Sequence, residues 1–456
     1  MASTYLSRTQ SSANSQIFTI SMWLKKCGTN TAFPMNMGSD DDNRIGILFN
    51  GNELELYGKV SASSVLDVRT NALYRDVNSW YHIVAKVDTT QATASDRAKI
   101  YVNGEEITSL KTSIYPSQNT NFSLTNHYIG NLDNAQSYYF DGYITHYHYT
   151  DGTAYDASTF GETDATTGIW KPKTAPSVTY GTNGFFLKFE NSGSMGTDSS
   201  GNANNFTVNG TMTQTVDTPS NVYATFNPLI YMPNTPTFEN GNLYVKGNDA
   251  NYCEAISTLS MPKSGKWYAE FKKIEINNCF MVGIGNTNNI IEALRTNTDI
   301  SPSGGGYSGG AVTIRDGGDV RQTNASDISG FFPSSIANTD IIGLAIDLDN
   351  GAVYSHKNGT YGVISSVTGD PTSGASKTGA IDISGQAWYQ NADFICFLFG
   401  NTSNSTKDWC QANFGNGYFG TTAVSSAGSN GNGAIFEYDV PTGYYALNTK
   451  NINTYG

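Results

Sequence analysis

Apolar and polar residues alternate along many short stretches of the chain, and a period of two residues is typical of a β-strand that buries one face. Residues 18–24 and 80–87 show this alternation over seven and eight positions. Both stretches are therefore predicted to be strands of a buried core. The side chains expected on a shared face are Phe18, Ile20 and Met22 in the first, and Tyr81, Ile83, Ala85 and Val87 in the second.

Two Asn-Gly pairs mark hairpins between such strands. Asn50-Gly51 separates the apolar stretches 45–49 and 54–57, and Asn103-Gly104 follows the stretch 99–102. Asn-Gly is favoured where both central residues of a tight turn take positive φ angles. The first part of the chain is thus predicted to be a series of antiparallel strands.

A further strand is predicted over residues 143–149, followed by a turn at Asp151-Gly152 and a second apolar strand over 185–189. Uninterrupted alternation would divide the side chains of 143–149 between two faces. One face would carry Thr145, Tyr147 and Tyr149, and the other Ile144, His146 and His148.

The second half of the chain repeats the pattern. Strands are predicted over 266–271, 282–285 and 341–348, with turns at Asn350-Gly351 and Asn358-Gly359. In the third of these, Ile342, Leu344, Ile346 and Leu348 line one face. The apolar run 394–399 contains Cys396, which we expect to be a small buried side chain.

Composition supports an all-β protein of more than one domain. The chain has 456 residues, of which only 14% are charged, together with 28 tyrosines and 22 phenylalanines. This length suggests two or three domains, and abundant aromatics with many turn residues suit short strands. We predict two β-sandwich domains, over 1–175 and 236–456, joined by a bridge over 176–235 that contains several prolines. The sequence leaves open whether the bridge completes the first domain.

Charge and cysteine content exclude several classes of function. A net charge of −13 with no basic cluster argues against nucleic-acid binding. Five widely spaced cysteines without a C-x-x-C pair favour folding in a reducing compartment. No stretch has the positive segment and apolar core of a signal peptide or the length of a membrane span, and no heptad pattern predicts a helical shaft.

Several motifs resemble those of a family of tailed-phage proteins. They are D-G-Y-I-x-x-x-H-Y-x-D-G and F-G-E-T-D-x-x-T-G-I-W-K-P-K, followed by Y-G-T-N-G-F-F-L-K-F. That family carries a laminin-G-like, concanavalin-A-type jelly roll followed by a SPRY-like domain. In the second half G-K-W-Y-x-E, D-L-D-N-G, K-N-G-T and N-F-G resemble the SPRY pattern, with Ser355 where that pattern has a large aromatic residue. The resemblance implies a structural protein on the outside of a virion, made in the host cytoplasm and released by lysis.

Catalytic motifs are missing from the sequence. Jelly-roll glycosidases place acidic residues as E-x-D-x-x-E or E-x-D-x-E on one strand, and neither string occurs. Glu53 and Glu55 share a strand face, which we interpret as solvated. His146 and His148 could form an H-x-H metal pair, but packed or exposed histidines are the favoured interpretation. We therefore predict no enzyme activity.

Two kinds of binding site have candidates. Loop carboxylates at Asp40, Asp41 and Asp42, and the loop 198–205, could hold calcium, the one cofactor considered. Carbohydrate binding would use aromatic rings and amides, for which the candidates are Tyr138, Tyr139, Trp388, Tyr389 and the loop 296–339. The alternative for these aromatics is packing at strand edges.

Three functional hypotheses follow. The first is a tail-fibre or receptor-binding protein that recognises host surface glycans. The second is a capsid decoration or head-fibre protein that contacts other virion subunits. The third, a polysaccharide depolymerase, is the weakest because no carboxylate pair is evident. Expected partners are other virion subunits, further copies of the chain and host glycans, without nucleic acid or membrane insertion.

Overall fold

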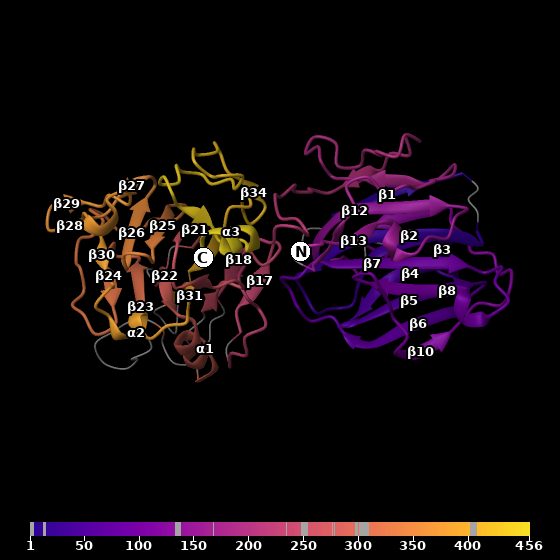
Figure 1. Cartoon of the computed structure of the whole chain (residues 1–456), viewed down its shortest axis with the longest axis horizontal. Coiled ribbons are helices and arrows are strands. Elements are labelled where there is room, and N and C mark those ends of the chain that lie inside the picture. Colours follow the sequence, from indigo (N-terminus) through magenta and orange to yellow (C-terminus); the bar gives the residue numbers. More distant parts are fainter. Residues whose placement is uncertain are drawn as a thin grey trace. The chain divides into compact units, whose positions relative to one another are not determined.

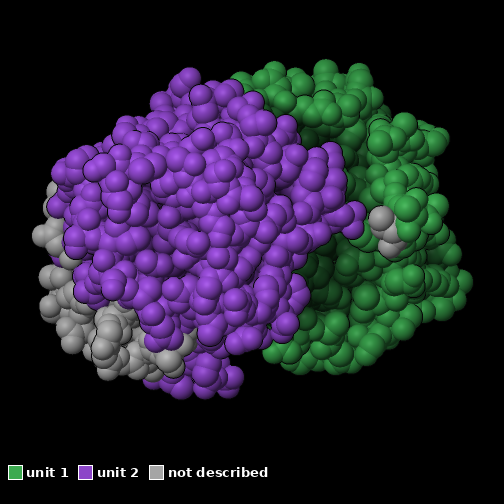
Figure 2. All heavy atoms as spheres, turned by 60° about the vertical axis from the view of Figure 1, so that its left-hand side comes forward, with its two compact units in different colours: residues 1–214, 218–220 green, residues 215–217, 221–456 purple. Residues whose placement is uncertain are grey.

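The computed structural model describes residues 4–456 apart from 12–14, 133–137, 167, 234, 248–253, 276, 278, 297–299, 301–309 and 402–407. The chain divides into two compact units, coloured separately in Figure 2. Unit 1 comprises Met1–Gln214 and Thr218–Ser220, and unit 2 comprises Thr215–Asp217 and Asn221–Gly456. Both consist almost entirely of antiparallel strands, so the predicted all-β class is confirmed.

Unit 1 contains an eight-stranded and a six-stranded sheet (Figure 1). Every strand pair in them is antiparallel, and each hairpin turn predicted from Asn-Gly joins neighbouring strands. In spatial order the first sheet comprises β10 (Leu110–Ile114), β6 (Ser63–Leu73), β5 (Glu53–Val60), β4 (Asn43–Asn50), β3 (Ala32–Asp40), β11 (Asn126–Ile129), β1 (Tyr5–Thr9) and β16 (Thr207–Asn209). The second comprises β15 (Phe185–Leu187), β12 (Gly142–Asp151), β2 (Ile17–Lys26), β7 (Tyr81–Asp88), β8 (Ala98–Val102) and β9 (Glu105–Glu106).

The core of unit 1 is formed by the inward-facing side chains of these two sheets. Phe18, Ile20, Met22 and Leu24 of β2 are fully buried in it, as the alternation predicts. Removing apolar surface from water stabilises such a core by about 25 cal/mol per Å². This burial fixes the register of β2, because a shift by one residue would turn the apolar face outward.

The alternation predicted for residues 143–149 is wrong over part of β12. The register of β12 against β2 shifts between Thr145 and His148, and His146 has a φ angle of 47°. This β-bulge adds one residue to the strand, so side chains on either side of it change face. As a result Ile144 packs against the same core as Tyr147 and Tyr149.

Residues 152–181 form a third layer over the outer face of the six-stranded sheet. This layer includes the turn η2 (Ala157–Thr159) and the short pair β13 (Gly161–Thr163) and β14 (Trp170–Pro172). A further turn, η1 (Ala94–Asp96), precedes β8. Phe160 and Ala157 pack against Val84 and Tyr101 of the sheet. The outer face of this sheet is therefore covered by the chain itself.

The segment 176–214, whose membership the sequence leaves open, supplies strands to both sheets of unit 1. β15 pairs with β12, and β16 pairs with β1. Between them the carboxylate of Asp198 accepts hydrogen bonds from the backbone N–H groups of Phe186, Ser200 and Asn204 at 2.8 to 2.9 Å. Asp198 thus fixes the turn that returns the chain to the first sheet.

Unit 2 also contains two large sheets (Figure 1), and their inner faces are apolar. The nine-stranded sheet comprises β17 (Thr237–Glu239), β18 (Tyr244–Lys246), β32 (Trp409–Asn413), β21 (Lys266–Lys273), β25 (Ile341–Asp347), β26 (Ala352–Lys357) and β27 (Thr360–Tyr361), with β30 (Ile381–Asp382) and β35 (Tyr445–Ala446) as branches. The six-stranded sheet comprises β19 (Ala255–Ile256), β31 (Phe394–Asn401), β22 (Phe280–Asn286), β23 (Ala311–Arg315) and β24 (Val320–Gln322), with β20 (Met261–Pro262) as a branch. Smaller elements are β28 (Val363–Ile364), β29 (Val367–Thr368), β33 (Tyr418–Phe419), β34 (Thr422–Ala423), η3 (Gly374–Ser376) and the helices α1 (Thr287–Thr296), α2 (Ala387–Gln390) and α3 (Thr449–Tyr455).

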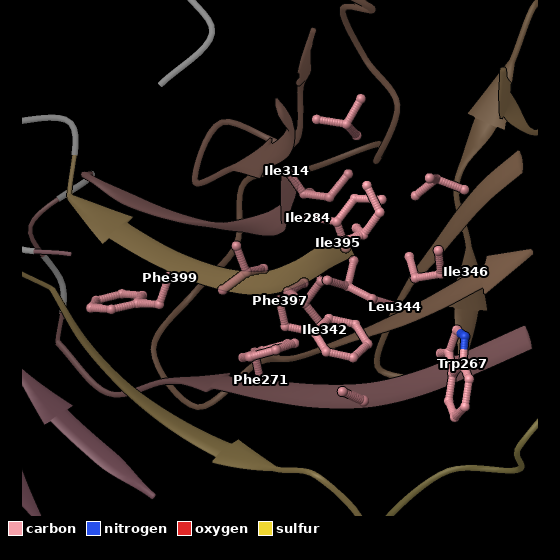
Figure 3. Close-up of a cluster of buried hydrophobic side chains, with 14 of the residues drawn as sticks. Trp267, Phe271, Ile284, Ile314, Ile342, Leu344, Ile346, Ile395, Phe397 and Phe399 are labelled. Carbon is pink, nitrogen blue, oxygen red and sulfur yellow. The ribbon is translucent and has the colours of Figure 1, made fainter. Parts of the chain in front are cut away.

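Figure 3 shows part of the core of unit 2, where side chains of β21 and β25 meet those of β22 and β31. Ile342, Leu344 and Ile346 of β25 lie in this core, which confirms the predicted face. Cys396 is fully buried, also as predicted. Among the described residues no helix is long and apolar enough to cross a membrane.

Candidate binding site on the eight-stranded sheet of unit 1

The described ends of the connection between β11 and β12, residues 130–132 and 138–141, lie against the eight-stranded sheet beside β3. Three backbone hydrogen bonds fix these ends: Gly130 N–H to Pro34 O at 2.9 Å, Phe140 N–H to Gly130 O at 2.9 Å, and Phe33 N–H to Tyr138 O at 3.0 Å. The loop therefore presents Tyr138 and Tyr139, two residues singled out by the sequence, at a defined place in unit 1.

Both tyrosine rings contact aromatic side chains that face outward from the sheet. Tyr138 lies over Phe33, with ring centroids 6.0 Å apart, and Tyr139 lies 6.3 Å from Tyr5. Tyr5 in turn lies 6.5 Å from Tyr128 of β11. Tyr138 is 53% exposed, whereas Phe33, Tyr5 and Tyr128 are buried. The arrangement is an exposed ring on an aromatic base.

Sequence analysis did not identify Phe33, Tyr5 or Tyr128, because Phe33 and Tyr5 lie far from Tyr138 along the chain and Tyr128 belongs to a different strand. A signal for Tyr5 and Tyr128 does exist in their neighbours. Leu6 and Ile129 belong to the core, so the preceding residue in each strand must face outward. Two outward tyrosines on neighbouring strands of a jelly roll could have been grouped on that basis.

The backbone at Tyr138 is held in an unusual conformation. Its φ angle is 54°, in the left-handed region. A residue with a Cβ atom pays about 1–2 kcal/mol to adopt this conformation. The hydrogen bond from Phe33 N–H and the ring contact with Phe33 maintain it. Such local strain is often found where a side chain must be presented to a ligand.

An amide lies on the same side of the sheet. Asn36 is opposite Tyr128 in the register of β3 and β11 and is only 3% exposed. Its Nδ2 donates to Leu132 O at 2.7 Å, while its buried Oδ1 has no hydrogen-bond donor among the described residues. The buried hydroxyl of Tyr139 likewise has no partner in the part of the chain that the structure describes. A buried polar atom without a partner costs about 1–3 kcal/mol, so both groups favour contact with further polar groups.

The face that carries Glu53 and Glu55 is less solvated than predicted. Glu55 is 4% exposed, and its Oε2 lies 2.9 Å from Nε of Arg69 on the neighbouring strand β6. Glu53 contacts the same guanidinium at 4.0 Å and Lys111 at 2.6 Å. Burial raises the pKa of Glu55, and the charge of Arg69 opposes this rise. The prediction of a solvated face failed because Arg69 and Leu48 cover Glu55 from both sides.

These carboxylates do not have the arrangement that glycoside hydrolysis requires. A glycosidase holds two carboxyl groups on either side of a sugar, one of them free to donate a proton. Here both glutamates contact the one guanidinium of Arg69, so they lie on the same side of it and not on either side of a sugar-sized space. The cluster is thus suited to holding β5 and β6 together.

A buried serine and histidine lie next to each other without forming a nucleophilic pair. Nδ1 of His82 accepts the indole N–H of Trp170 at 2.9 Å. In the neutral ring the proton therefore lies on Nε2, which donates to Ser21 Oγ at 2.9 Å. Burial lowers the pKa of His82 to about 3. The ring consequently cannot accept a proton from Ser21.

The H-x-H pair is packed, as the favoured interpretation of the sequence has it. His148 stacks on Phe186 with ring centroids 3.9 Å apart, and its Nδ1 lies 2.8 Å from the hydroxyl of Tyr180. His146 occupies the β-bulge, where its Nδ1 lies 3.1 Å from Thr145 Oγ1. His148 therefore serves the contact between the sheet and its outer layer, through Tyr180 and Phe160.

The aspartates considered for calcium do not converge on one point. Asp40 accepts hydrogen bonds from Ser39, Asn43 and the backbone of Asp42, while Asp41 pairs with Arg44 at 2.9 Å. Asp198, in the other candidate loop, is occupied by the donors of its own turn. Within the described ranges no group of three or more His, Cys, Asp or Glu side chains is placed to hold a metal ion.

Trp388 and Tyr389 lie in α2 and pack into the core of unit 2, where they are 6% and 8% exposed. The Tyr389 hydroxyl donates to the carbonyl of Leu348. Neither ring offers a face to a ligand, because the apolar side of α2 is turned inward. The loop 296–339 was the other candidate for carbohydrate binding. Its residues 297–299 and 301–309 lie outside the described residues.

Comparison with known proteins places the first part of the chain in a recognised fold. Residues 1–157 match the family model described as "Concanavalin A-like lectin/glucanases superfamily". This match covers the strands from β1 to β12 and supports a laminin-G-like jelly roll in unit 1. No curated protein matches the chain.

Solved structures similar to the chain include three sandwich proteins. The SPRY domain of human HERC1 is 13% identical, covering 41% of this chain and 96% of that domain, with a TM-score of 0.28. A heptameric SAP-like pentraxin from Limulus polyphemus is 15% identical, covering 40% and 88%, with a TM-score of 0.29. Domains LG4-5 of the mouse laminin alpha1 chain are 9% identical, covering 87% and 79%, with a TM-score of 0.29.

Proposed function

We propose that unit 1 binds carbohydrate on the outer face of its eight-stranded sheet, with Tyr138 as the principal contact and without catalysis. A lectin-type jelly roll is compatible with binding of carbohydrate or protein. The observation that favours carbohydrate is the exposed ring of Tyr138 on an aromatic base, beside the buried amide of Asn36. Sugars stack their C–H faces on aromatic rings and exchange hydrogen bonds with amides and hydroxyls.

A binding role without bond cleavage is supported by the chemistry of the polar clusters. Glu53 and Glu55 share Arg69, and His82 has its proton on the nitrogen that faces Ser21. The glutamates are thus engaged by one guanidinium, and His82 is not placed to accept a proton from Ser21. A polysaccharide depolymerase is accordingly not our proposal, and no metal or other cofactor is part of it.

We further propose that the chain belongs to a tailed-phage virion. There it would be a tail-fibre or receptor-binding component that recognises host glycans. The support is the resemblance of the sequence motifs to that family. Labelling of particles with an antibody against the chain should mark the tail. Label on the head would favour the decoration hypothesis, in which the chain contacts other virion subunits.

A glycan array tests the carbohydrate proposal directly. The wild-type chain should give signals for a defined group of bacterial surface glycans, and Tyr138→Ala should lose them. Ile169→Ala is a matched control, because Ile169 is an exposed apolar side chain of the same unit at 60% exposure. Silence of the wild-type chain across a broad array would reject the proposal.

A further inference from the structure

The nine-stranded sheet of unit 2 is covered on only part of its outer face. Residues 415–446 pack over its centre, where Phe436 contacts Tyr268 with ring centroids 4.8 Å apart and Tyr444 joins the same cluster as Tyr354. At one end of these strands the cover reaches β32 and the turn between β17 and β18, because Gly420 lies next to the side-chain amides of Gln411 and Asn240. Strands β17, β18 and β32 continue beyond this point.

Six outward-facing side chains occupy this part of the face, of which Tyr244 is buried at 8% exposure and the other five are partly exposed. The register pairs Tyr244 with Gln411 and Lys246 with Trp409 across β18 and β32, and Gln411 with Lys272 across β32 and β21. Neighbouring strands lie about 4.8 Å apart, so these side chains form one continuous surface. Its members are Glu239, Tyr244, Lys246, Lys272, Trp409 and Gln411, hereafter the open-face cluster.

Part of this cluster is held rigidly by its own contacts. The rings of Tyr244 and Trp409 meet at an interplanar angle of 66° with centroids 6.1 Å apart. Nζ of Lys246 lies 4.8 Å from the first ring centroid and 5.2 Å from the second, and it pairs with Glu239 at 2.7 Å. Glu239 therefore neutralises Lys246, and the indole of Trp409 is fixed in orientation.

The remaining polar groups of the cluster are uncommitted. Within the described part of the chain the indole N–H of Trp409, the side-chain amide of Gln411 and the ammonium group of Lys272 make no hydrogen bond or ion pair. All three side chains are partly exposed. Lys272 lies only over the ring of Phe419, at 5.7 Å. Counting only the described residues, the surface thus combines an indole, three donors without an acceptor and one cation without a carboxylate partner.

We propose that the open-face cluster binds an acidic sugar unit, a uronate residue of an anionic polysaccharide. The C–H face of the sugar ring would pack on Trp409, and its carboxylate would accept from Lys272. A hydroxyl group would exchange hydrogen bonds with Gln411. A donor-rich surface with one unpaired cation fits a ligand that carries many acceptor oxygens and a negative charge. This site lies in unit 2 and is independent of the carbohydrate site proposed for unit 1.

Nuclear magnetic resonance provides a direct test with the full chain. The chain has six tryptophans, and the indole N–H signal of Trp409 can be assigned with Trp409→Phe. Titration with oligomannuronate should shift this signal in a saturable manner. Lys272→Met should weaken binding about tenfold through loss of the charge-assisted contact, and added salt should weaken it as well.

Controls separate this site from other effects. Lys450→Met removes an exposed lysine elsewhere in unit 2, and Tyr138→Ala removes the proposed site in unit 1; both should bind oligomannuronate as the wild type does. A Trp409 signal that does not move with oligomannuronate would overturn the proposal. So would equal binding of an uncharged cello-oligosaccharide of the same length, or unchanged affinity in a folded Lys272→Met variant.

Discussion

The indole of Trp170 donates a hydrogen bond to Nδ1 of His82 at 2.9 Å, which joins the outer layer of unit 1 to the sheet beneath it. His82 is also stacked against Trp23, with ring centroids 4.8 Å apart. The histidine is thus enclosed by two indoles and bonded at both ring nitrogens. The bond adds to the apolar contacts of Ala157 and Phe160 that hold residues 152–181 on the sheet.

Replacing Trp170 by Phe should destabilise unit 1 by about 1–3 kcal/mol, because the buried Nδ1 of His82 loses the indole N–H that it accepts. Urea unfolding measures this difference in the free energy of unfolding. Ile169→Ala serves as a control at the neighbouring position, where the side chain is exposed and a change below about 0.5 kcal/mol is expected. A Trp170→Phe variant as stable as the wild type would show that the bond does not hold the layer.

The salt bridges on β5 and β6 predict that Arg69 contributes more to stability than Lys111, although both contact glutamates. Arg69→Ala leaves Glu55 buried without its partner and should cost about 2–4 kcal/mol of stability. Lys111→Ala removes an exposed partner of Glu53 and should cost less than about 1 kcal/mol. If the two variants lost equal free energies of unfolding in urea, the claim that Glu55 depends on Arg69 because it is buried would be wrong.

Buried histidines predict that unit 1 loses stability in mild acid. Burial lowers the pKa of His82 and of His127 to about 3 and that of His148 well below its ordinary value. In the unfolded chain these groups titrate near 6.5, so the unfolded state binds more protons between pH 6.5 and 3. Each histidine should reduce stability by up to about 1.4 kcal/mol per pH unit across this window.

Unit 2 should respond less to the same change of pH. Its His356 has a pKa lowered to about 3, but burial raises the pKa of Glu270 from 4.5 to about 7. Between pH 7 and 4.5 the folded state therefore binds the extra proton at Glu270, and acid stabilises the fold through this group. Pulsed proteolysis at pH 7 and pH 5, with fragments assigned by mass spectrometry, should show greater loss of stability in unit 1. Equal losses of stability in both units would contradict the claim that protonation of Glu270 offsets the effect of His356 in unit 2.

Glu270 also predicts how the cover over the nine-stranded sheet is held. Its carboxylate accepts the backbone N–H groups of Glu437 and Tyr438, each at 2.9 Å, and the hydroxyl of Tyr268 at 3.0 Å. In Glu270→Ala these donors lose a buried acceptor. Backbone hydrogen exchange should therefore become faster in residues 436–438, while exchange in β25 changes less. Unchanged protection of that segment would show that apolar packing alone holds the cover.

Much of the fold could be predicted from the sequence, because burial of one strand face leaves a period-2 pattern. The faces of β2 and β25 were predicted correctly for this reason. The face of β12 was predicted only in part, because the bulge at His146 has no glycine or proline to signal it. A bulge depends on pairing with β2, which is a tertiary effect.

The candidate site was less predictable than the fold. Tyr138 and Tyr139 were found because adjacent tyrosines in a polar loop are visible locally. Their aromatic base was missed because Phe33 and Tyr5 approach them only through the sheet. The pair Trp388-Tyr389 resembles Tyr138-Tyr139 in sequence but belongs to the core. Burial of a short amphipathic turn depends on the sheets around it, which the local sequence does not show.

The most direct test of the proposed function is calorimetric titration of the best glycan from the array into the wild-type chain and into Tyr138→Ala. The account predicts saturable binding to the wild type and at least about tenfold weaker binding to the variant, with Ile169→Ala unaffected. Equal affinity of wild type and a folded Tyr138→Ala variant would contradict a binding site at this ring.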